Sequence, residues 1–269
     1  ATPVGTPPNA IVIGALRDLA GINVAFSDWV FLATPMVAVM LFVCWKLLML
    51  LFPPKTQRFE MDMSGRFDLS TKAIVLYATF GVTILLWMTE KLHGIDSSVV
   101  ACLPIAALPL TRTVNKDDIR SMAWEVLWLV AGGFCLGATL GVTGTDKWLI
   151  DRVDWAAYPS LALVLFAGLG IFFSNFMSHT VTAALMGPIA VTVGLTIGGA
   201  SGNGDFSIGI FAVVVGVAAS LGMVLPISTP PNALAYATGM VKTRDMAKAG
   251  IIIGVLGFVI TILCAWTYW

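Results

Sequence analysis

An eight-residue phrase rich in proline and hydroxyl side chains occurs twice in this chain, and its residue types suit the binding of small ions. The copies, Pro3–Ala10 and Pro226–Ala233, begin 223 positions apart and agree at six of eight positions. In each copy a threonine precedes two prolines, Thr6 in the first and Thr229 in the second. Because threonine suits the N-cap and proline suits the first helical turn, each copy predicts the start of a helix.

A helix that starts inside a membrane offers an ion two kinds of ligand. Its unpaired N–H groups and partial positive charge attract a carboxylate or another oxyanion. The unwound backbone before it offers carbonyl oxygens to a small cation. The small residues Gly5 and Ser228 let the backbone approach a ligand closely. A proline kink in a packed helix would explain either copy taken alone, whereas two copies favour a binding site.

A third polar cluster, Ser174–Thr180, interrupts the apolar stretch Ser160–Ala200. Two apolar arms that meet at a polar tip without a charged residue predict a re-entrant hairpin, although two full spans joined by a loop also fit. The ionisable residue of the cluster is His179. An intramembrane histidine is costly unless it faces a cavity or a partner, so His179 is a site candidate. The alternative is a neutral histidine bonded to a backbone carbonyl.

The composition predicts a helical membrane protein that carries these motifs on several spans. Hydrophobic residues make up 58% and charged residues 11%, and the mean hydropathy is +0.91, whereas soluble domains contain about 25% charged residues. The zero net charge excludes a nucleic-acid partner held by a basic surface. The four cysteines lie singly in apolar segments, as core residues do. The chain lacks an initial methionine and begins only two residues before the first phrase, which predicts a fragment of a longer protein.

The hydrophobic pattern predicts a half-helix from about Asn9 to Ala20, followed by longer apolar segments. About 20 residues, at about 1.5 Å each, cross a hydrocarbon core of about 30 Å. The longer segments are Asp28–Phe52, Thr71–Leu92, Ser97–Val114, Trp124–Thr143, Ser160–Ala200, Phe206–Met240 and Met246–Trp269.

Lysine and arginine are concentrated in loops 53–72, 112–120 and 242–248, which predicts that these loops are cytoplasmic. We therefore expect a multi-pass protein of the cell (inner) membrane. Its C-terminus would lie outside, with an aromatic belt of Trp266, Tyr268 and Trp269 at the interface. On this path the two phrases run antiparallel, as in inverted-topology repeats that hold a substrate near the midplane. Chance recurrence of a proline-rich break is the alternative.

These motifs resemble those of the divalent-anion/sodium symporters, the carriers of succinate, citrate and related di- and tricarboxylates, with sulfate carriers among their relatives. The resemblance rests on the Thr-Pro-Pro-Asn-Ala breaks and on the hairpin tip followed by an apolar helix. It covers essentially the whole chain, as the C-terminal half and a little more of such a protein. In that family each Ser-Asn-Thr tip faces one broken-helix loop, and the sodium ions and the substrate lie between them.

The resemblance implies roles for residues of all three motifs. Substrate contacts would come from Thr6, Pro7, Ser178, His179, Thr180, Thr229 and Pro230. Sodium ligands would come from Gly5, Ser174, Met177, His179 and Ser228. His179 stands where the family has asparagine. This departure puts the second sodium site in doubt and opens proton coupling or sodium-independent anion exchange, of sulfate included, as the alternative.

The resemblance also implies an all-α polytopic fold with inverted-topology repeats, broken helices and a re-entrant hairpin, working as an elevator-type homodimer. Residues 1–53 and 159–269 would belong to the transport domain, and residues 54–158 to the linker and scaffold. The segment Lys55–Lys72 mixes charged and large apolar residues and predicts an amphipathic cytoplasmic linker. The partner of the first phrase, the first Ser-Asn-Thr tip, would precede Ala1.

Two other classes of protein fit the sequence less well. A cation exchanger or metalloid carrier of the same superfamily needs an intramembrane carboxylate, and Glu90, Asp96 and Glu125 lie at span ends. An intramembrane enzyme could use Ser178 and His179. Adjacent residues do not face each other, however, so this pair lacks the hydrogen bond of a catalytic dyad. We therefore expect a transporter and not an enzyme.

Overall fold

The computed structural model describes residues 1–53, 67–122, 124–145, 148, 155, 157–201 and 204–269. Every element in this part of the chain is a helix, so the all-α prediction is confirmed. Five of these helices are long and apolar enough to cross a membrane. They are α2 (Phe26–Leu51), α3 (Thr71–Met88), α9 (Pro159–Phe176), α10 (His179–Ser201) and α13 (Thr243–Thr267).

The described part of the chain contains eight further elements, of which α7 coincides with the predicted span 124–143. They are α1 (Pro7–Ala20), α4 (Glu90–His93), α5 (Ser97–Leu110), α6 (Lys116–Arg120), α7 (Trp124–Thr143), α11 (Gly204–Ala219), the 3-10 turn η1 (Pro226–Ser228) and α12 (Pro230–Ala237). The predicted span 71–92 breaks at Thr89, and the span 97–114 ends as a helix at Leu110. The segment 206–240 leaves the helical conformation after Ala219, seven residues before the second phrase begins.

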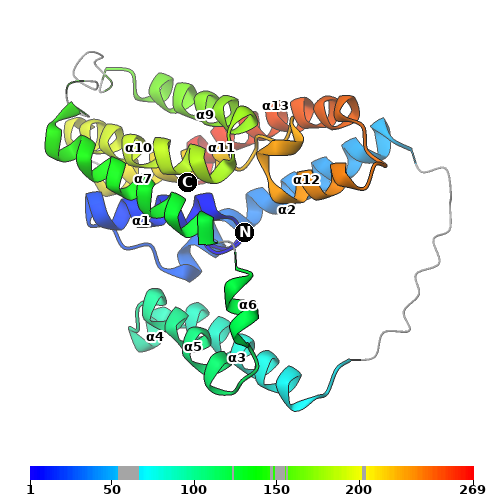
Figure 1. The fold of residues 1–269 in the computed structure, drawn as a ribbon. Helices are drawn as coiled ribbons and strands as arrows, with labels where there is room; N and C mark the ends of the chain where they lie inside the picture. Colours follow the sequence, from blue (N-terminus) through cyan, green and yellow to red (C-terminus); the bar gives the residue numbers. More distant parts are fainter. Residues whose placement is uncertain (54–66, 123, 146–147, 149–154, 156, 202–203) are drawn as a thin grey trace.

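Helix α11 lies at the centre of the larger group of helices and packs against α1, α9, α10 and α13 (Figure 1). Two glycines let α1 come close to its neighbours, because Val12 contacts Gly216 of α11 and Gly187 of α10. Val12 and Leu16 of α1 are completely buried. Small residues at helix contacts are the usual means of tight packing between spans. Helix α1, which follows the first phrase, is therefore fixed against α10 and the last part of α11.

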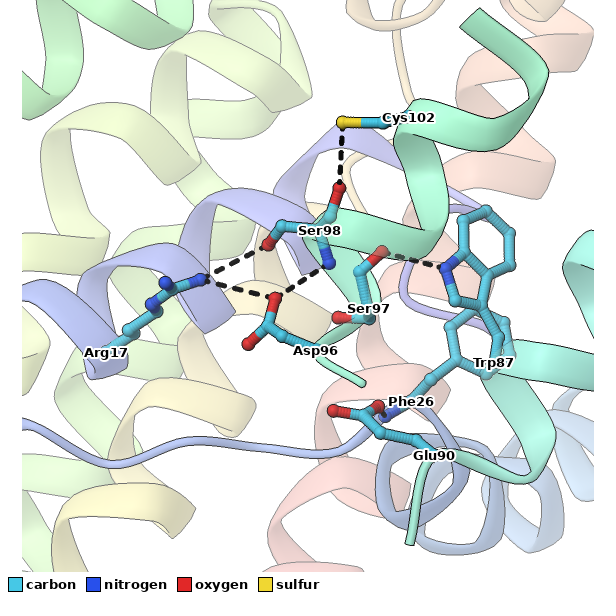
Figure 2. Close-up of polar contacts among 8 residues, drawn as sticks. All are labelled: Arg17, Phe26, Trp87, Glu90, Asp96, Ser97, Ser98 and Cys102. Carbon is cyan, nitrogen blue, oxygen red and sulfur yellow. Dashed lines mark hydrogen bonds and ion pairs between the residues drawn. The ribbon is translucent and has the colours of Figure 1, made fainter. Parts of the chain in front are cut away.

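Helices α3, α4, α5 and α6 form a second group below the first in Figure 1. Its described link to the larger group includes a buried carboxylate (Figure 2). Glu90 is 8% exposed, and its Oε2 accepts a hydrogen bond of 3.1 Å from the backbone N of Phe26, the first residue of α2. The ring of Phe26 stacks on Trp87 at 4.9 Å, and the indole N–H of Trp87 donates to the Ser97 carbonyl oxygen.

Two ion pairs complete this link, which we call the corner contact. The larger group contributes Arg17, Phe26 and Asp28, and the second group contributes Trp87, Glu90, Lys91, Asp96 and Ser98. Figure 2 shows these residues except Asp28 and Lys91. Arg17 lies 3.7 Å from the Asp96 carboxylate, and its Nη1 donates to Ser98 Oγ at 3.2 Å. Lys91 pairs with Asp28 at the start of α2. The corner contact therefore joins the α1–α2 connection to the α4–α5 connection.

The C-terminus returns to α2, and one part of the predicted aromatic belt is wrong. Trp269 is 4% exposed, because its ring N–H donates to the Leu32 carbonyl oxygen at 3.0 Å and its side chain joins the core. The Tyr268 hydroxyl donates to the Phe31 carbonyl oxygen, while Trp266 faces outward. Most of the predicted linker, residues 55–66, lies outside the described residues.

Candidate functional site

A two-residue connection joins α9 to α10, so the end of one helix and the start of the next form a single tip. Met177 and Ser178 make the connection. Ser178 Oγ accepts a hydrogen bond of 3.2 Å from the backbone N of Val181 and thereby caps the first turn of α10. The tight turn brings the last turn of α9 and the first turn of α10 to the same place.

This tip is hydrogen-bonded to the segment that follows α11. Ser174 Oγ donates to the Ala219 carbonyl oxygen at 2.7 Å, and His179 Nε2 donates to the Gly222 carbonyl oxygen at 2.7 Å. Both side chains are buried. Because a carbonyl oxygen only accepts, the His179 ring carries a hydrogen on Nε2, and a neutral ring then accepts at Nδ1. The histidine bonded to a backbone carbonyl, the alternative drawn from the sequence, is therefore the observed arrangement.

A third hydrogen bond and a close approach complete the contact between the tip and this segment. The side-chain oxygen of Asn175 accepts from the backbone N of Val224 at 2.9 Å. Gly222 lies so close to Ser174 that a Cβ on Gly222 would collide with the serine side chain. We call residues 219–224 the unwound segment. The tip side chains satisfy three of its backbone groups, the carbonyl oxygens of Ala219 and Gly222 and the N–H of Val224, while the N–H groups of Ser220 and Leu221 still bond to carbonyl oxygens of α11.

The first phrase reaches the same segment through a hydroxyl. Thr6 is the extended N-cap of α1, as predicted, but its side chain makes no capping bond. Instead, Thr6 Oγ1 lies 3.2 Å from Ser220 Oγ. Asn9 is buried and its amide donates to the Thr2 carbonyl oxygen at 2.9 Å. The structure therefore brings together one predicted residue of the first phrase and two of the tip, all on the unwound segment.

The second phrase forms a helix start of its own. Thr229 is the N-cap of α12, and its hydroxyl accepts from the backbone N of Asn232 at 3.3 Å. Ser228 is buried, where it donates to the Leu225 carbonyl oxygen and accepts from the Asn232 amide. Among the described residues, the tip side chains Ser174, Asn175 and His179 bond to the unwound segment. None of these hydrogen bonds reaches the second phrase at residues 228–230. The other predicted residues are Gly5, Pro7, Met177 and Pro230, which are exposed, and Thr180, which is half-buried.

A cavity of about 230 Å³ lies beside the two hydroxyls of Thr6 and Ser220. Its opposite wall is the apolar face of α2, including Trp29 and Met36. Trp29 is 1% exposed and its ring N–H has no hydrogen-bond partner in the part of the chain that the structure describes. The polar side chains that line the cavity are those of Thr6, Asn9 and Ser220, and hydroxyl groups can donate to an oxyanion or offer oxygen to a cation.

A family model described as the sodium:sulfate symporter transmembrane region matches residues 2–269. The chain belongs to this symporter family. The resemblance seen in the sequence is thereby confirmed, as is the expectation that the chain is not an enzyme, because the family consists of membrane transporters.

The relatives of this sodium:sulfate symporter family member include transporters whose names state a substrate class. An uncharacterised transporter of Haemophilus influenzae is 30% identical over 287 residues, which cover 100% of this chain and 59% of the relative. A sodium-dependent dicarboxylate transporter of Staphylococcus saprophyticus is 25% identical, and the matched region covers 97% of this chain and 54% of the relative. A sodium-dependent high-affinity dicarboxylate transporter of Caenorhabditis elegans is 24% identical, with 97% and 53% covered. The chain therefore spans little more than half the length of these curated relatives.

Four residues of the candidate site were not identified from the sequence as ligands. Ser220 and Gly222 contact the predicted residues Thr6, Ser174 and His179 directly, and Asn175 bonds to the unwound segment at Val224. Thr182, in the first turn of α10, is 1% exposed, and its hydroxyl has no partner among the described residues. A lone serine or glycine in an apolar run is common in spans, so Ser220 and Gly222 carried no clear signal. Thr182 carried one, because it continues the polar positions of the tip.

The site contains no Asp, Glu, Lys or Arg in residues 1–9, 174–182 or 219–232. Ser178 and His179 are each bonded elsewhere, to Val181 and Gly222, so they form no catalytic pair. No group of three or more His, Cys, Asp or Glu side chains that could hold a metal ion occurs in the described residues. The site is therefore a neutral cluster of hydroxyls, amides, carbonyl oxygens and helix starts.

Proposed function

We propose that the complete protein carries small di- or tricarboxylate anions, such as succinate or citrate, across the membrane with sodium as the coupling ion. The observation that carries the proposal is the meeting of the first phrase and the hairpin tip on one unwound segment, through Thr6–Ser220 at 3.2 Å and His179–Gly222 at 2.7 Å. The dicarboxylate transporters of Staphylococcus and Caenorhabditis support the substrate class.

Charge balance supports an anion together with a cation. The site supplies no formal charge of its own, so a carboxylate there relies on the helix start of α1 and on hydroxyl or N–H donors. A sodium ion bound beside it would balance the remaining charge. Each carbonyl oxygen has two lone pairs, so those of Ala219 and Gly222 can accept from the tip and still bind a small cation. Of the sodium ligands proposed from the sequence, Ser174 and His179 bond to this segment, while Gly5, Met177 and Ser228 remain proposals.

The depth of the tip supports a re-entrant hairpin over the two-span alternative, which the lengths of α9 and α10 also fit. A Cβ on Gly250 of α13 would collide with the backbone of Met223 in the unwound segment. Gly250 lies seven residues beyond the start of α13 at Thr243, which is about 10 Å along the helix. The tip that is bonded to this segment therefore lies level with a point about 10 Å along α13, and not level with the start of that helix.

The alternative function is a sodium-independent or proton-coupled anion exchanger, sulfate included, and the observation that favours it is His179. Imidazole is a poorer ligand for a hard cation than an amide oxygen. It can also take up a proton in the physiological range. We nevertheless place sodium coupling first, because the remaining oxygen ligands do not depend on this residue.

The elevator mechanism and the homodimer extend this proposal. Residues 1–53 and 159–269 form the moving part, and residues 54–158 form the linker and the scaffold. The separate grouping of α3, α4, α5 and α6 supports this division. Helix α7 packs against α10, so it would be a scaffold helix in contact with the moving part.

The test replaces one hydroxyl in each phrase, as Thr6→Val and Thr229→Val in the complete protein. Thr34→Val is the matched control, because the Thr34 hydroxyl bonds its own helix at the Val30 carbonyl oxygen. We expect uptake of radiolabelled succinate to fall about tenfold or more in the two phrase variants, as for the loss of one hydrogen bond to a charged ligand, and to stay unchanged in the control. Undiminished uptake by both phrase variants would refute the site.

A further inference from the structure

An apolar groove of about 340 Å³ runs along the outside of the molecule between α9 and α13. Asn175 is the polar side chain in its wall, and both ends of that side chain are occupied, by the Ile171 carbonyl oxygen and the Val224 N–H. The other side chains that line the groove are apolar, so it favours a hydrocarbon occupant. Its lining residues on α13 include Ile251, Val255 and Phe258.

The hollow depends on the absence of a side chain at Gly168 of α9. A Cβ at this position would meet the ring of Phe258 at 3.9 Å, which is ordinary contact, with nothing closer. A side chain at residue 168 would thus extend into the groove without moving the backbone. The two helices run antiparallel here, since Gly168 faces Phe258 while Ile171 faces Gly254.

Two cations stand at one end of the groove on the same face of α13. Arg244 and Lys248 are exposed, and neither has a carboxylate partner among the described residues. At about 100° per residue, Arg244, Lys248, Ile251, Val255 and Phe258 fall within an arc of about 80° of the helix. The cations therefore lie in line with the floor of the groove.

We propose that the groove binds one acyl chain of an anionic phospholipid whose phosphate is held by Arg244 and Lys248. The dimensions agree with this occupant: Lys248 and Phe258 are ten residues apart, about 15 Å along the helix. That distance equals the hydrocarbon depth of one leaflet, half of about 30 Å. Loop 242–248 is predicted to be cytoplasmic, and the cytoplasmic leaflet carries the anionic lipids. This lipid site does not depend on the proposed transport function.

Native mass spectrometry of the complete, purified protein tests the proposal with dioleoylphosphatidylglycerol as the anionic probe and dioleoylphosphatidylcholine as the neutral one. The double variant Arg244→Gln/Lys248→Gln removes the cations. We expect it to lower retention of the anionic lipid by about thirtyfold, from about 1 kcal/mol for each cation, and to leave the neutral lipid unchanged. Lys72→Gln, an exposed lysine in the predicted cytoplasmic loop 53–72, is the matched control and should retain both lipids.

A second variant, Gly168→Leu, fills the groove and should lower retention of both lipids. Gly168→Ala adds a smaller side chain, which the structure accommodates at ordinary contact distance from Phe258. If the leucine variant fails to fold, the alanine variant still tests whether the groove holds the lipid. Equal retention of the anionic lipid by the wild type and the charge variant would overturn the proposal. Loss in the charge variant with full retention in both glycine variants would overturn it as well, because the lipid would then be held by the charges alone.

Discussion

His179 has two roles in the candidate site, one structural and one chemical. It holds the unwound segment by donating to the Gly222 carbonyl oxygen, and it presents a ring nitrogen where the family pattern has an amide. An asparagine could donate to the same carbonyl and would still have an oxygen for a cation. The histidine thus retains the structural contact and, in the proposed function, would alter the chemistry offered to a coupling ion.

We therefore expect His179→Asn to steepen the sodium dependence of succinate uptake and to weaken its dependence on pH. The amide supplies an oxygen ligand and removes the titrating ring. The measurement is initial uptake over a series of sodium concentrations at acidic and at alkaline pH. His93→Asn is the matched control, because His93 also donates to a backbone carbonyl, that of Leu86, but lies at the end of α4. Sodium and pH profiles identical to the wild type would contradict the role of His179.

The site residues that the sequence predicted are those whose polarity stands out in an apolar segment. Thr6, Ser174 and His179 belong to this kind, and the structure brings them to one segment. Ser220 and Gly222 could not be singled out, because their importance comes from neighbours 214 and 48 positions away in the chain, Thr6 and Ser174. Such contacts arise from helix packing and leave no trace in local spacing.

Helix starts were the best-predicted elements, because their signals are local. Both phrases begin helices at a threonine followed by proline, α1 at Pro7 and α12 at Pro230. The unwound segment was not predicted, because its residues are mostly apolar and fit a continuing helix. Its conformation is held instead by Ser174 and His179, which donate to the Ala219 and Gly222 carbonyl oxygens, and by Asn175, which accepts from the Val224 N–H.

The cap of α5 gives a prediction with a definite pH dependence. The backbone N–H of Ser98 donates to Asp96, which lowers the pKa of this carboxyl below its usual value, with help from the Ser98 hydroxyl and Arg17. A lowered folded pKa means stability that is present above the unfolded pKa and is lost as pH falls through the folded pKa. Asp96→Ala should cost about 1 kcal/mol at neutral pH.

Thermal unfolding of the purified protein in detergent measures both effects. Asp96→Asn keeps an oxygen that can cap the helix but removes the titrating charge, so it should be nearly as stable as the wild type at neutral pH. The stability lost by the wild type below about pH 4 should be smaller in this variant. Asp18→Asn, an exposed aspartate on α1, is the charge control. An unchanged acid profile in Asp96→Asn would show that Asp96 does not contribute.

At the scale of the whole molecule, the sequence predicted the helices but not their grouping. In a membrane, the lipid-facing and core-facing sides of a helix are both apolar, so hydrophobic periodicity does not reveal neighbours. Glycine contacts allow the helices to pack closely around the central α11. Helices α3, α4, α5 and α6 form a separate group, which the corner contact links to the larger one. The ion pair of Asp28 and Lys91 spans the two groups.

The elevator proposal requires this corner contact to separate during transport. A short bifunctional thiol reagent on the pair Asp28→Cys/Lys91→Cys should hold the two groups together, in a background where Cys44, Cys102, Cys135 and Cys264 are replaced by serine. We expect the cross-linked protein to bind succinate and to lose uptake, since only the movement is blocked. Cross-linking of Asp117→Cys/Arg120→Cys, an ion pair within α6, should affect neither. Full uptake by protein whose residues 28 and 91 are completely cross-linked would rule out a movement that separates the two groups, while leaving the binding site to be judged by the succinate measurement.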